Sequence, residues 1–290
     1  MGKVIVIAIS LFYLTTVLHA AEPIEKLFNI NTIVRDAGVP PAASCAGENR
    51  PKSTVAVDSQ PEESNTIRWN KAGFGSPALT VLDSSDLYSS QSPVKFTHQF
   101  QMTSVVFRNA GWTVEQAVQK VKNTAWIFSQ CGIKISKAII VETDAPNGWI
   151  DVDDTVEQGR TGRSFEITKR LPLVDRPILF HVRSSESSSL AYANPVCWTG
   201  ADSPLANTAW ITTKANSPEY KKEKNGEYEV EAHEIGHILG NWDAKVAFGH
   251  RYLDDENIMG PGTGRYGNRF DENQCKDMKK SPLLTRMRRP

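Results

Sequence analysis

The spacing of hydrophobic residues changes along the chain, and each change predicts a secondary-structure element. Residues 95–109, KFTHQFQMTSVVFRN, contain alternating and β-branched positions that are typical of a strand. In residues 111–132, GWTVEQAVQKVKNTAWIFSQCG, the apolar residues recur at helical spacing. Thr113 and Gln116 form a capping-box pattern at its start, and Gly132 is suited to end it. The pattern therefore predicts a strand followed by an amphipathic helix.

Three more strand patterns and a second helix follow. Residues 133–144, 176–184 and 207–213 are rich in β-branched and aromatic residues, and helical spacing returns in residues 227–240. The rest is irregular apart from one short helix around residues 271–280. This order predicts a mixed α+β fold with a twisted sheet of about four to five strands and two long helices. The C-terminal part forms an irregular subdomain with one helix.

The N-terminal part of the chain has a different composition. Residues 1–21 contain one lysine, an apolar run from Val4 to Leu18 and small residues at Ala20 and Ala21, which indicates a removable export signal. The run is shorter than the ~20 apolar residues that a membrane anchor needs, so we expect no stable membrane insertion. Residues 22–95 are rich in Pro, Ser, Gly and Asn and are expected to be a loosely folded segment. Residues 96–290 are expected to be the main domain.

Overall composition narrows the function classes. Hydrophobic residues make up 40% of the 290 residues, enough for a sizeable core. The 33 Lys and Arg residues equal the 33 Asp and Glu residues, and the only basic cluster is the short C-terminal LTRMRRP. Phosphate binding requires a basic surface, so nucleic acid is not the expected partner. We expect a secreted monomer.

The sequence HEIGHILGNWD, residues 233–243, holds the main candidate for chemistry. Residues four apart lie on one face of a helix, so His233 and His237 can direct their imidazoles at a single ion. Glu234 lies beside them, within reach of a water molecule held by that ion. The alternative is an ordinary helix with two unrelated histidines.

A catalytic zinc ion usually takes three protein ligands. If the helix continued, Asp243 would lie ~9 Å beyond His237 along the axis, on another face. Gly240 can adopt the left-handed conformation that reverses the chain, which would return Asp243 to the histidines. His250 is the rival third ligand, and Glu256 is a further alternative.

With these residues the sequence resembles the metzincin clan of zinc metallopeptidases, whose signature is HExxHxxGxx followed by His or Asp. The resemblance extends over roughly residues 95–280 in element order and is densest in HEIGHILGNWD and ENIMGPG. It implies a mostly parallel sheet with an antiparallel edge strand, and a methionine turn below the ion at Met259. Asp243 stands where most of the clan has histidine, as in snapalysin-like enzymes. A carboxylate ligand lowers the charge of the site, so we expect activity at neutral or mildly alkaline pH.

The resemblance implies a secreted zinc endopeptidase that cleaves extended protein or peptide substrates. Glu234 would be the general base and acid for a metal-activated water. Residues 207–213 occupy the place of the edge strand that pairs with substrate, so Trp210 either packs in the core or lines the cleft. Tyr266 is a further candidate for substrate contact. The alternatives are a zinc-containing binding module without catalysis and a zinc amidase acting on a cell-wall crosslink.

Four cysteines allow three full pairings. Adamalysin-like relatives bridge similar places to Cys197 and Cys275, which implies that pair and leaves Cys45 to bind Cys131. Alternatively, Cys45 is a thiolate that caps the zinc ion in a latent zymogen, as in matrix metallopeptidases, although their motif around that cysteine is absent. Residues 22–95 would then act as a propeptide.

Overall fold

The structure is a computed structural model that describes residues 68–88, 94–153, 162–172, 174–186, 189–217, 229–242, 256–260 and 267–288. Its helices and strands follow the predicted order closely, with several short elements between them. In chain order they are β1 Ala78–Asp83, α3 Ser84–Tyr88, β2 His98–Phe107, α4 Val114–Gln130, β3 Ile133–Thr143, η3 Pro146–Gly148, β4 Asp151–Val152, α6 Arg163–Arg170, β5 Ile178–Val182, β6 Ser184–Ser185, β7 Ala191–Asn194, α7 Val196–Thr199, β8 Thr208–Thr212, η4 Thr213–Asn216, α9 Val230–Gly240, α10 Glu272–Met278 and β9 Thr285–Arg286.

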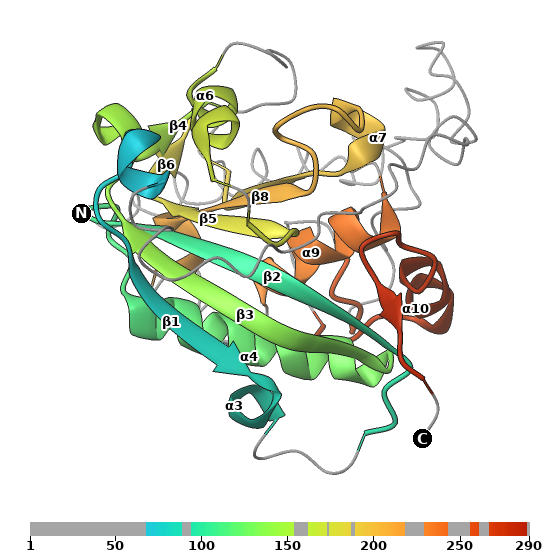
Figure 1. Ribbon diagram of the computed structural model, residues 1–290. Helices are drawn as coiled ribbons and strands as arrows, with labels where there is room; N and C mark the ends of the chain where they lie inside the picture. Colours follow the sequence, from blue (N-terminus) through green and yellow to red (C-terminus); the bar gives the residue numbers. More distant parts are fainter. Residues whose placement is uncertain are drawn as a thin grey trace, which may run out of the picture. The chain divides into compact units, whose positions relative to one another are not determined.

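One large sheet organises the fold (Figure 1). Its strand order is β1-β3-β2-β5-β8-β7, and β9 pairs with β2. The four central strands are parallel, whereas β1, β7 and β9 pair antiparallel with their neighbours. The predicted mixed α+β class with a mostly parallel sheet and an antiparallel edge is confirmed. Over the described residues the sheet has seven strands, more than the four to five expected, because the sequence patterns of β1, β7 and β9 are too weak to predict a strand.

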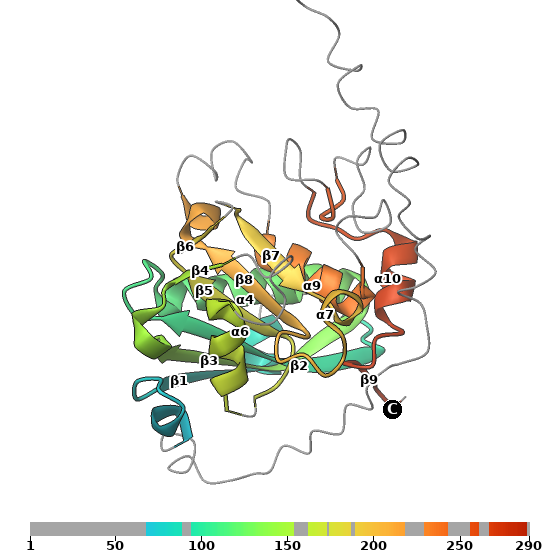
Figure 2. The ribbon, with the colours of Figure 1, turned by 90° about the horizontal axis from the view of Figure 1, so that it is seen from above.

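The two long helices pack side by side on the sheet. α4 contacts β3 and β2, α9 contacts β7 and β8, and the two helices contact each other (Figure 2). The capping box of Thr113 and Gln116 is formed as predicted at the start of α4, and Gly132 takes a left-handed φ of 67° just after its end. The amphipathic pattern of this segment therefore predicted both the helix and its two ends.

The segment before residue 96 contributes to the folded unit. β1 pairs with β3 over six residue pairs, from Ala78 with Glu142 to Asp83 with Lys137. The side chains of Trp69, Phe74 and Leu87 are buried in the same core as the central strands. The expected division at residue 95 is therefore not a structural boundary: a Ser- and Gly-rich sequence still supplies an edge strand when its few apolar residues are buried. Residues 1–67, which include the predicted signal, lie outside the described residues.

Within the part of the chain that the structure describes, the edge strand next to α9 is β7, not the segment 207–213 as expected. That segment forms β8, which pairs with β5 on one side and with β7 on the other. All five residues of β8 are buried. Strand β7 is only four residues long and has no clear alternation, so the sequence pattern did not reveal it.

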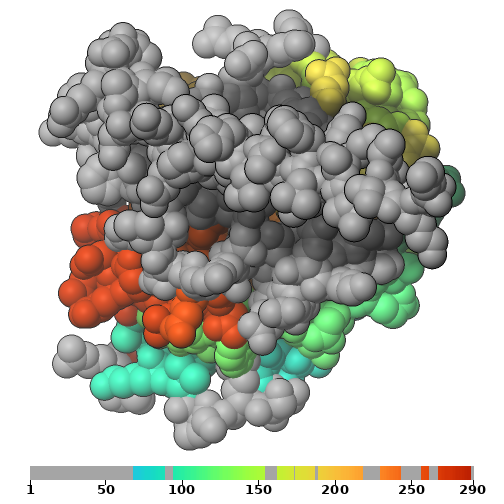
Figure 3. Space-filling view, turned by 180° about the vertical axis from the view of Figure 1, so that it is seen from behind, coloured from blue at the N-terminus to red at the C-terminus, as the bar shows by residue number. Residues whose placement is uncertain are grey.

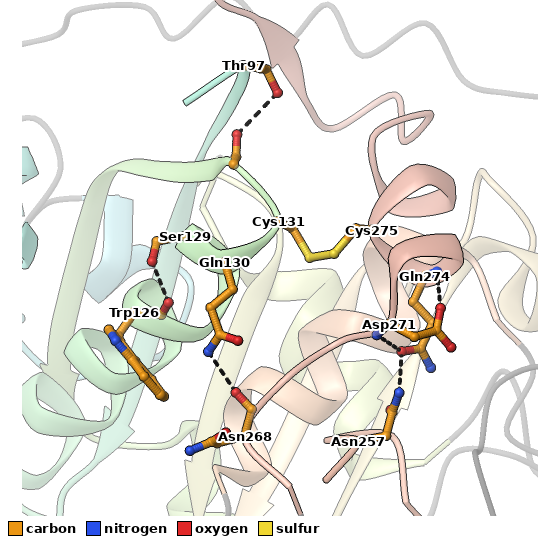
Figure 4. The surroundings of a disulfide bond; sticks show 11 residues. Thr97, Trp126, Ser129, Gln130, Cys131, Asn257, Asn268, Asp271, Gln274 and Cys275 are labelled. Atoms are coloured by element: carbon orange, nitrogen blue, oxygen red, sulfur yellow. Dashed lines mark hydrogen bonds between the residues drawn. A yellow bond between two sulfur atoms is a disulfide. The ribbon is translucent and has the colours of Figure 1, made fainter. Parts of the chain in front are cut away.

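A disulfide bond joins the end of α4 to α10. Cys131 binds Cys275, with their Cα atoms 5.1 Å apart (Figure 4). In the space-filling view the red C-terminal residues lie against the green residues of α4 (Figure 3). The expected pairs Cys197 with Cys275 and Cys45 with Cys131 are therefore wrong, because α10 packs at the C-terminal end of α4 instead of near α7. No helix within the described ranges combines the length and apolar character needed to span a bilayer.

Candidate metal centre

Helix α9 carries the HEIGH residues and is buried along nearly its whole length. Its first turn is anchored to α4 by an ion pair, in which Lys120 Nζ lies 2.9 Å from Glu229 Oε2. Asn123 Nδ2 donates to the other oxygen of Glu229 at 2.6 Å. Charged groups at this depth are tolerated only when they are paired, so these contacts fix where α9 begins.

The two histidines point at each other from successive turns of α9. Their Nε2 atoms are 3.1 Å apart, and both side chains are buried. His233 Nδ1 donates to the carbonyl oxygen of Ile258 at 2.8 Å, and His237 Nδ1 donates to that of Trp242 at 3.3 Å. A carbonyl oxygen only accepts hydrogen bonds, so in the neutral rings each Nδ1 carries the hydrogen and each Nε2 presents a lone pair.

This arrangement fits a metal ion. Two neutral rings whose lone pairs face each other at 3.1 Å are stabilised when a cation lies against both. Zinc–nitrogen distances of about 2.0–2.1 Å allow one ion to contact both atoms. The hydrogen bonds from Nδ1 to backbone carbonyls are the support that metal-binding histidines usually receive. The pair could therefore hold zinc, as the spacing of His233 and His237 predicted.

Glu234 is the third polar residue of the motif and is buried beside the histidines. Burial, together with the negative charge of Glu231, raises the pKa of its carboxyl to about 8. The interior thus favours the protonated carboxyl, whereas a cation held by the two histidines would favour the carboxylate. A carboxyl balanced in this way is suited to accept and return a proton.

The turn that ends α9 differs from the expected one. Gly240 is the last residue of the helix, and Asn241 adopts the left-handed conformation, with φ 51° and ψ 43°. Gly240 is required for a different reason, since a Cβ there would lie 2.1 Å from the ring of Trp242. The chain does reverse after His237, but the reversal occurs one residue later than predicted and uses an asparagine.

Met259 lies directly below α9. A Cβ added to Gly236 would be 2.9 Å from Met259 Sδ and 3.0 Å from the ring of Phe270. Gly236 belongs to the helical turn that joins the two histidines, so the methionine sulfur packs against that turn of α9. Met259 is fully buried. Met259 therefore packs against α9, and its expected role as a methionine turn below a metal ion stays a prediction.

Several predicted site residues lie outside the described residues, namely Asp243, His250, Tyr266 and Cys45. Within the described ranges, no group of three or more His, Cys, Asp or Glu side chains is arranged to hold a metal. The alternative ligand Glu256 is exposed and pairs with Arg269 at 2.6 Å. Its position does not support a role as the third ligand.

Trp210 does not contribute to the surface of a cleft. Its side chain is fully buried in β8, and its ring stacks on that of Phe180 with centroids 4.2 Å apart. Tyr192 of β7 lies on its other side, with centroids 6.4 Å apart. The prediction of a substrate-binding role for Trp210 is wrong, because the flanking strand β7 covers the residue.

The groups that support the histidines were not predicted from local sequence patterns. Two of them are the backbone carbonyls of Ile258 and Trp242, which leave no signature in side-chain identity. Asn257 was also missed, although a polar residue directly before an apolar Ile-Met pair is a local signal. It is completely buried.

Comparisons with known proteins add little to this description. No protein-family model matches the sequence, and a search of curated proteins finds no match. Among solved structures, the chain is similar to metalloproteinase-II from Bacteroides fragilis, with a TM-score of 0.39 and 12% identity. The match covers 66% of this chain and 55% of that one, so this chain spans about half the length of that protein. A likeness this low carries no argument about function.

Proposed function

We propose that this protein is an exported zinc-dependent endopeptidase of the metzincin type. The observation that supports the proposal best is the pair of Nε2 atoms 3.1 Å apart, each on a ring whose Nδ1 donates to a carbonyl. An ordinary surface helix has no reason to bury two imidazoles with their lone pairs facing each other. Glu234 beside them supplies the carboxyl that peptide hydrolysis requires.

The residues of this chain have separate tasks in the proposed reaction. His233 and His237 would hold zinc, with Asp243 as the proposed third ligand. When bound, zinc would supply the Lewis acidity that activates water and polarises the scissile carbonyl. Glu234 accepts the proton from the attacking water and delivers it to the leaving nitrogen. Its burial keeps bulk water away from that carboxyl.

Substrate binding is proposed at β7 instead of residues 207–213. This strand is the last one of the described sheet on the side of α9, and it runs antiparallel to β8. An extended peptide added beside β7 would be recognised mainly through main-chain hydrogen bonds, with little regard to its sequence. Such recognition favours an endopeptidase over an amidase for cell-wall crosslinks.

The test combines metal analysis with digestion of a generic fluorescent protein substrate. We expect one zinc per chain and cleavage that stops on addition of a chelator. Glu234→Gln should keep the zinc and lose most of the turnover, because the amide cannot accept a proton. A Glu166→Gln variant is the matched control, since Glu166 lies on α6, where it pairs with Arg170 outside the proposed site, and it should cleave normally.

Other outcomes select the alternatives. Bound zinc without cleavage of any protein would indicate a binding module, and cleavage limited to cell-wall crosslinks would indicate an amidase. Protein cleavage that continues in Glu234→Gln would contradict the mechanism. For the third ligand, Asp243→Ala should lose zinc and His250→Ala should retain it.

Export is proposed on two grounds. The first 21 residues have the composition of an export signal. The disulfide between Cys131 and Cys275 is of a kind that persists mainly in oxidising compartments. Mass spectrometry of the secreted protein would locate the new N-terminus.

A further inference from the structure

The carbonyl that accepts a hydrogen bond from His233 Nδ1 belongs to a short segment that is itself held by contacts with the C-terminal part of the chain. This segment, Glu256–Gly260, contains Ile258, whose carbonyl accepts from His233 Nδ1 at 2.8 Å. The amide of Ile258 donates to the carbonyl of Arg269 at 2.8 Å, which sets the direction of the peptide. The position of the imidazole thus depends on what holds residues 256–260.

Asn257 makes two hydrogen bonds that hold this segment. Its Oδ1 accepts from the backbone amide of Met259 at 2.9 Å, which closes the turn around Ile258. Its Nδ2 donates to Gln274 Oε1 at 2.8 Å. Asn257 is completely buried, so water cannot replace either bond.

Gln274 is itself rigidly positioned (Figure 4). It forms the capping box of α10, in which Asp271 Oδ1 accepts from the amide of Gln274 at 2.8 Å and Gln274 Oε1 accepts from the amide of Asp271 at 2.9 Å. The next residue is Cys275, which is bonded to Cys131 at the end of α4. Asn257 therefore connects the backbone acceptor of His233 to a covalently fixed helix.

We infer that Asn257 is a positioning residue that tunes metal affinity by holding the Ile258 carbonyl against His233. The inference rests on the proposed metal site. With Asn257 in place, His233 keeps its hydrogen on Nδ1 and its lone pair on Nε2 before an ion arrives. Without it, the turn around Ile258 relaxes, the hydrogen bond to His233 weakens, and the ring loses its fixed tautomer and direction. Loss of such support typically weakens metal binding by about 10- to 100-fold.

Two variants of the full-length chain test this role. Asn257→Ala removes both hydrogen bonds. Asn257→Asp keeps an acceptor for the Met259 amide and removes only the donor to Gln274. Gln130→Ala is the matched control, because Gln130 Nε2 also joins α4 to the C-terminal segment, at the Asn268 carbonyl, without contacting residues 256–260.

The readouts are the zinc dissociation constant, measured by competition with a chromophoric chelator, and nitrogen-15 NMR of the histidine rings. In the wild type, slowly exchanging Nδ1–H signals are expected from both His233 and His237. Asn257→Ala should bind zinc about 10- to 100-fold more weakly and lose the His233 signal while keeping that of His237. The zinc affinity of Asn257→Asp should lie between those of Asn257→Ala and the wild type. Gln130→Ala should match the wild type in both readouts.

Three results would overturn the inference. The first is zinc affinity within twofold of wild type in Asn257→Ala, with both ring signals intact. The second is simultaneous loss of both signals in either Asn257 variant, which would reveal general loosening instead of a local role. The third is a wild-type chain that binds no zinc, and only this result would overturn the proposed function as well.

Discussion

His181 offers a quantitative test of how the core is built. It lies in β5, completely buried, with its Nε2 2.9 Å from Ser104 Oγ and the ring of Trp112 edge-on at 4.7 Å. Its Nδ1 has no hydrogen-bond partner among the described residues. Burial, together with the nearby positive charge of Lys120, lowers the pKa of His181 from 6.5 to about 3. The folded protein therefore holds this imidazole neutral.

The consequence for stability follows from proton linkage. In the unfolded chain the ring binds a proton below pH 6.5, whereas in the folded protein it does so only below about pH 3. The unfolded state thus binds more protons in this window, and stability is lost as pH falls from 6.5 towards 3. Each pH unit corresponds to about 1.4 kcal/mol, so the interval between 6.5 and about 3 is worth on the order of 5 kcal/mol. At pH 4.5 roughly 3 kcal/mol of this is already lost.

The perturbation is His181→Gln, which keeps a side chain capable of hydrogen bonding but cannot bind a proton. Urea unfolding followed by tryptophan fluorescence, from pH 7.5 to 4.5, measures the free energy of unfolding of both proteins. Above pH 6.5 the variant should be less stable by about 1–2 kcal/mol, because it loses the Trp112 contact. As pH falls, the difference in free energy of unfolding should shrink and reverse. Only in the wild type does protonation of His181 stabilise the unfolded chain. Contributions from His233 and His237 are common to both proteins and cancel. If the free energies of unfolding of the two proteins differ by a constant amount between pH 6.5 and 4.5, the reasoning is refuted.

Three further predictions concern the turn after α9, the disulfide and the N-terminus. Gly240→Ala should destabilise the protein by about 1–3 kcal/mol and reduce zinc content, because a methyl group collides with Trp242. Asn241→Gly should lower the free energy of unfolding by only about 1 kcal/mol, through loss of its hydrogen bond with the Cys197 amide. If urea unfolding shows that both variants are destabilised equally, the separate roles of Gly240 and Asn241 are contradicted. Replacing both Cys131 and Cys275 by serine, which opens a loop of 144 residues, should cost about 2–5 kcal/mol in the same assay, and an unchanged midpoint would be the contrary result. N-terminal sequencing of the secreted protein should find a mature chain that still contains all of β1, since its loss would expose the edge of β3; an active form beginning at residue 96 would disprove this.

Local sequence was sufficient wherever one element carries its own signal. The strands β2, β3, β5 and β8 and the helices α4, α9 and α10 were all predicted, because each combines a clear hydrophobic period with turn or capping residues. The shared face of His233 and His237 was also predictable. Residues four apart lie on one face of any helix, independently of the rest of the fold. Short elements such as β7 were missed because four residues do not establish a period.

Contacts between distant segments could not be predicted from the sequence. Whether Cys131 binds Cys275 or Cys45 depends on which helices pack together, and no local pattern encodes that. The role of Trp210 likewise depended on β7 lying beside β8. The left-handed residue at the end of α9 was misassigned to Gly240, since glycine fits that conformation best in isolation, whereas here the packing of Trp242 uses the glycine and leaves the turn to Asn241.

By itself, the sequence determined the chemical groups, their spacing on α9 and the class of fold, because these follow from backbone periodicity and side-chain identity over a few turns. The tertiary structure alone decided which carbonyls fix the tautomer of each histidine, which strand forms the edge beside α9 and which cysteines are joined. These depend on distances between residues far apart in the chain, from Asn257 and Gln274 to Cys131, and such distances are set only when the whole core packs.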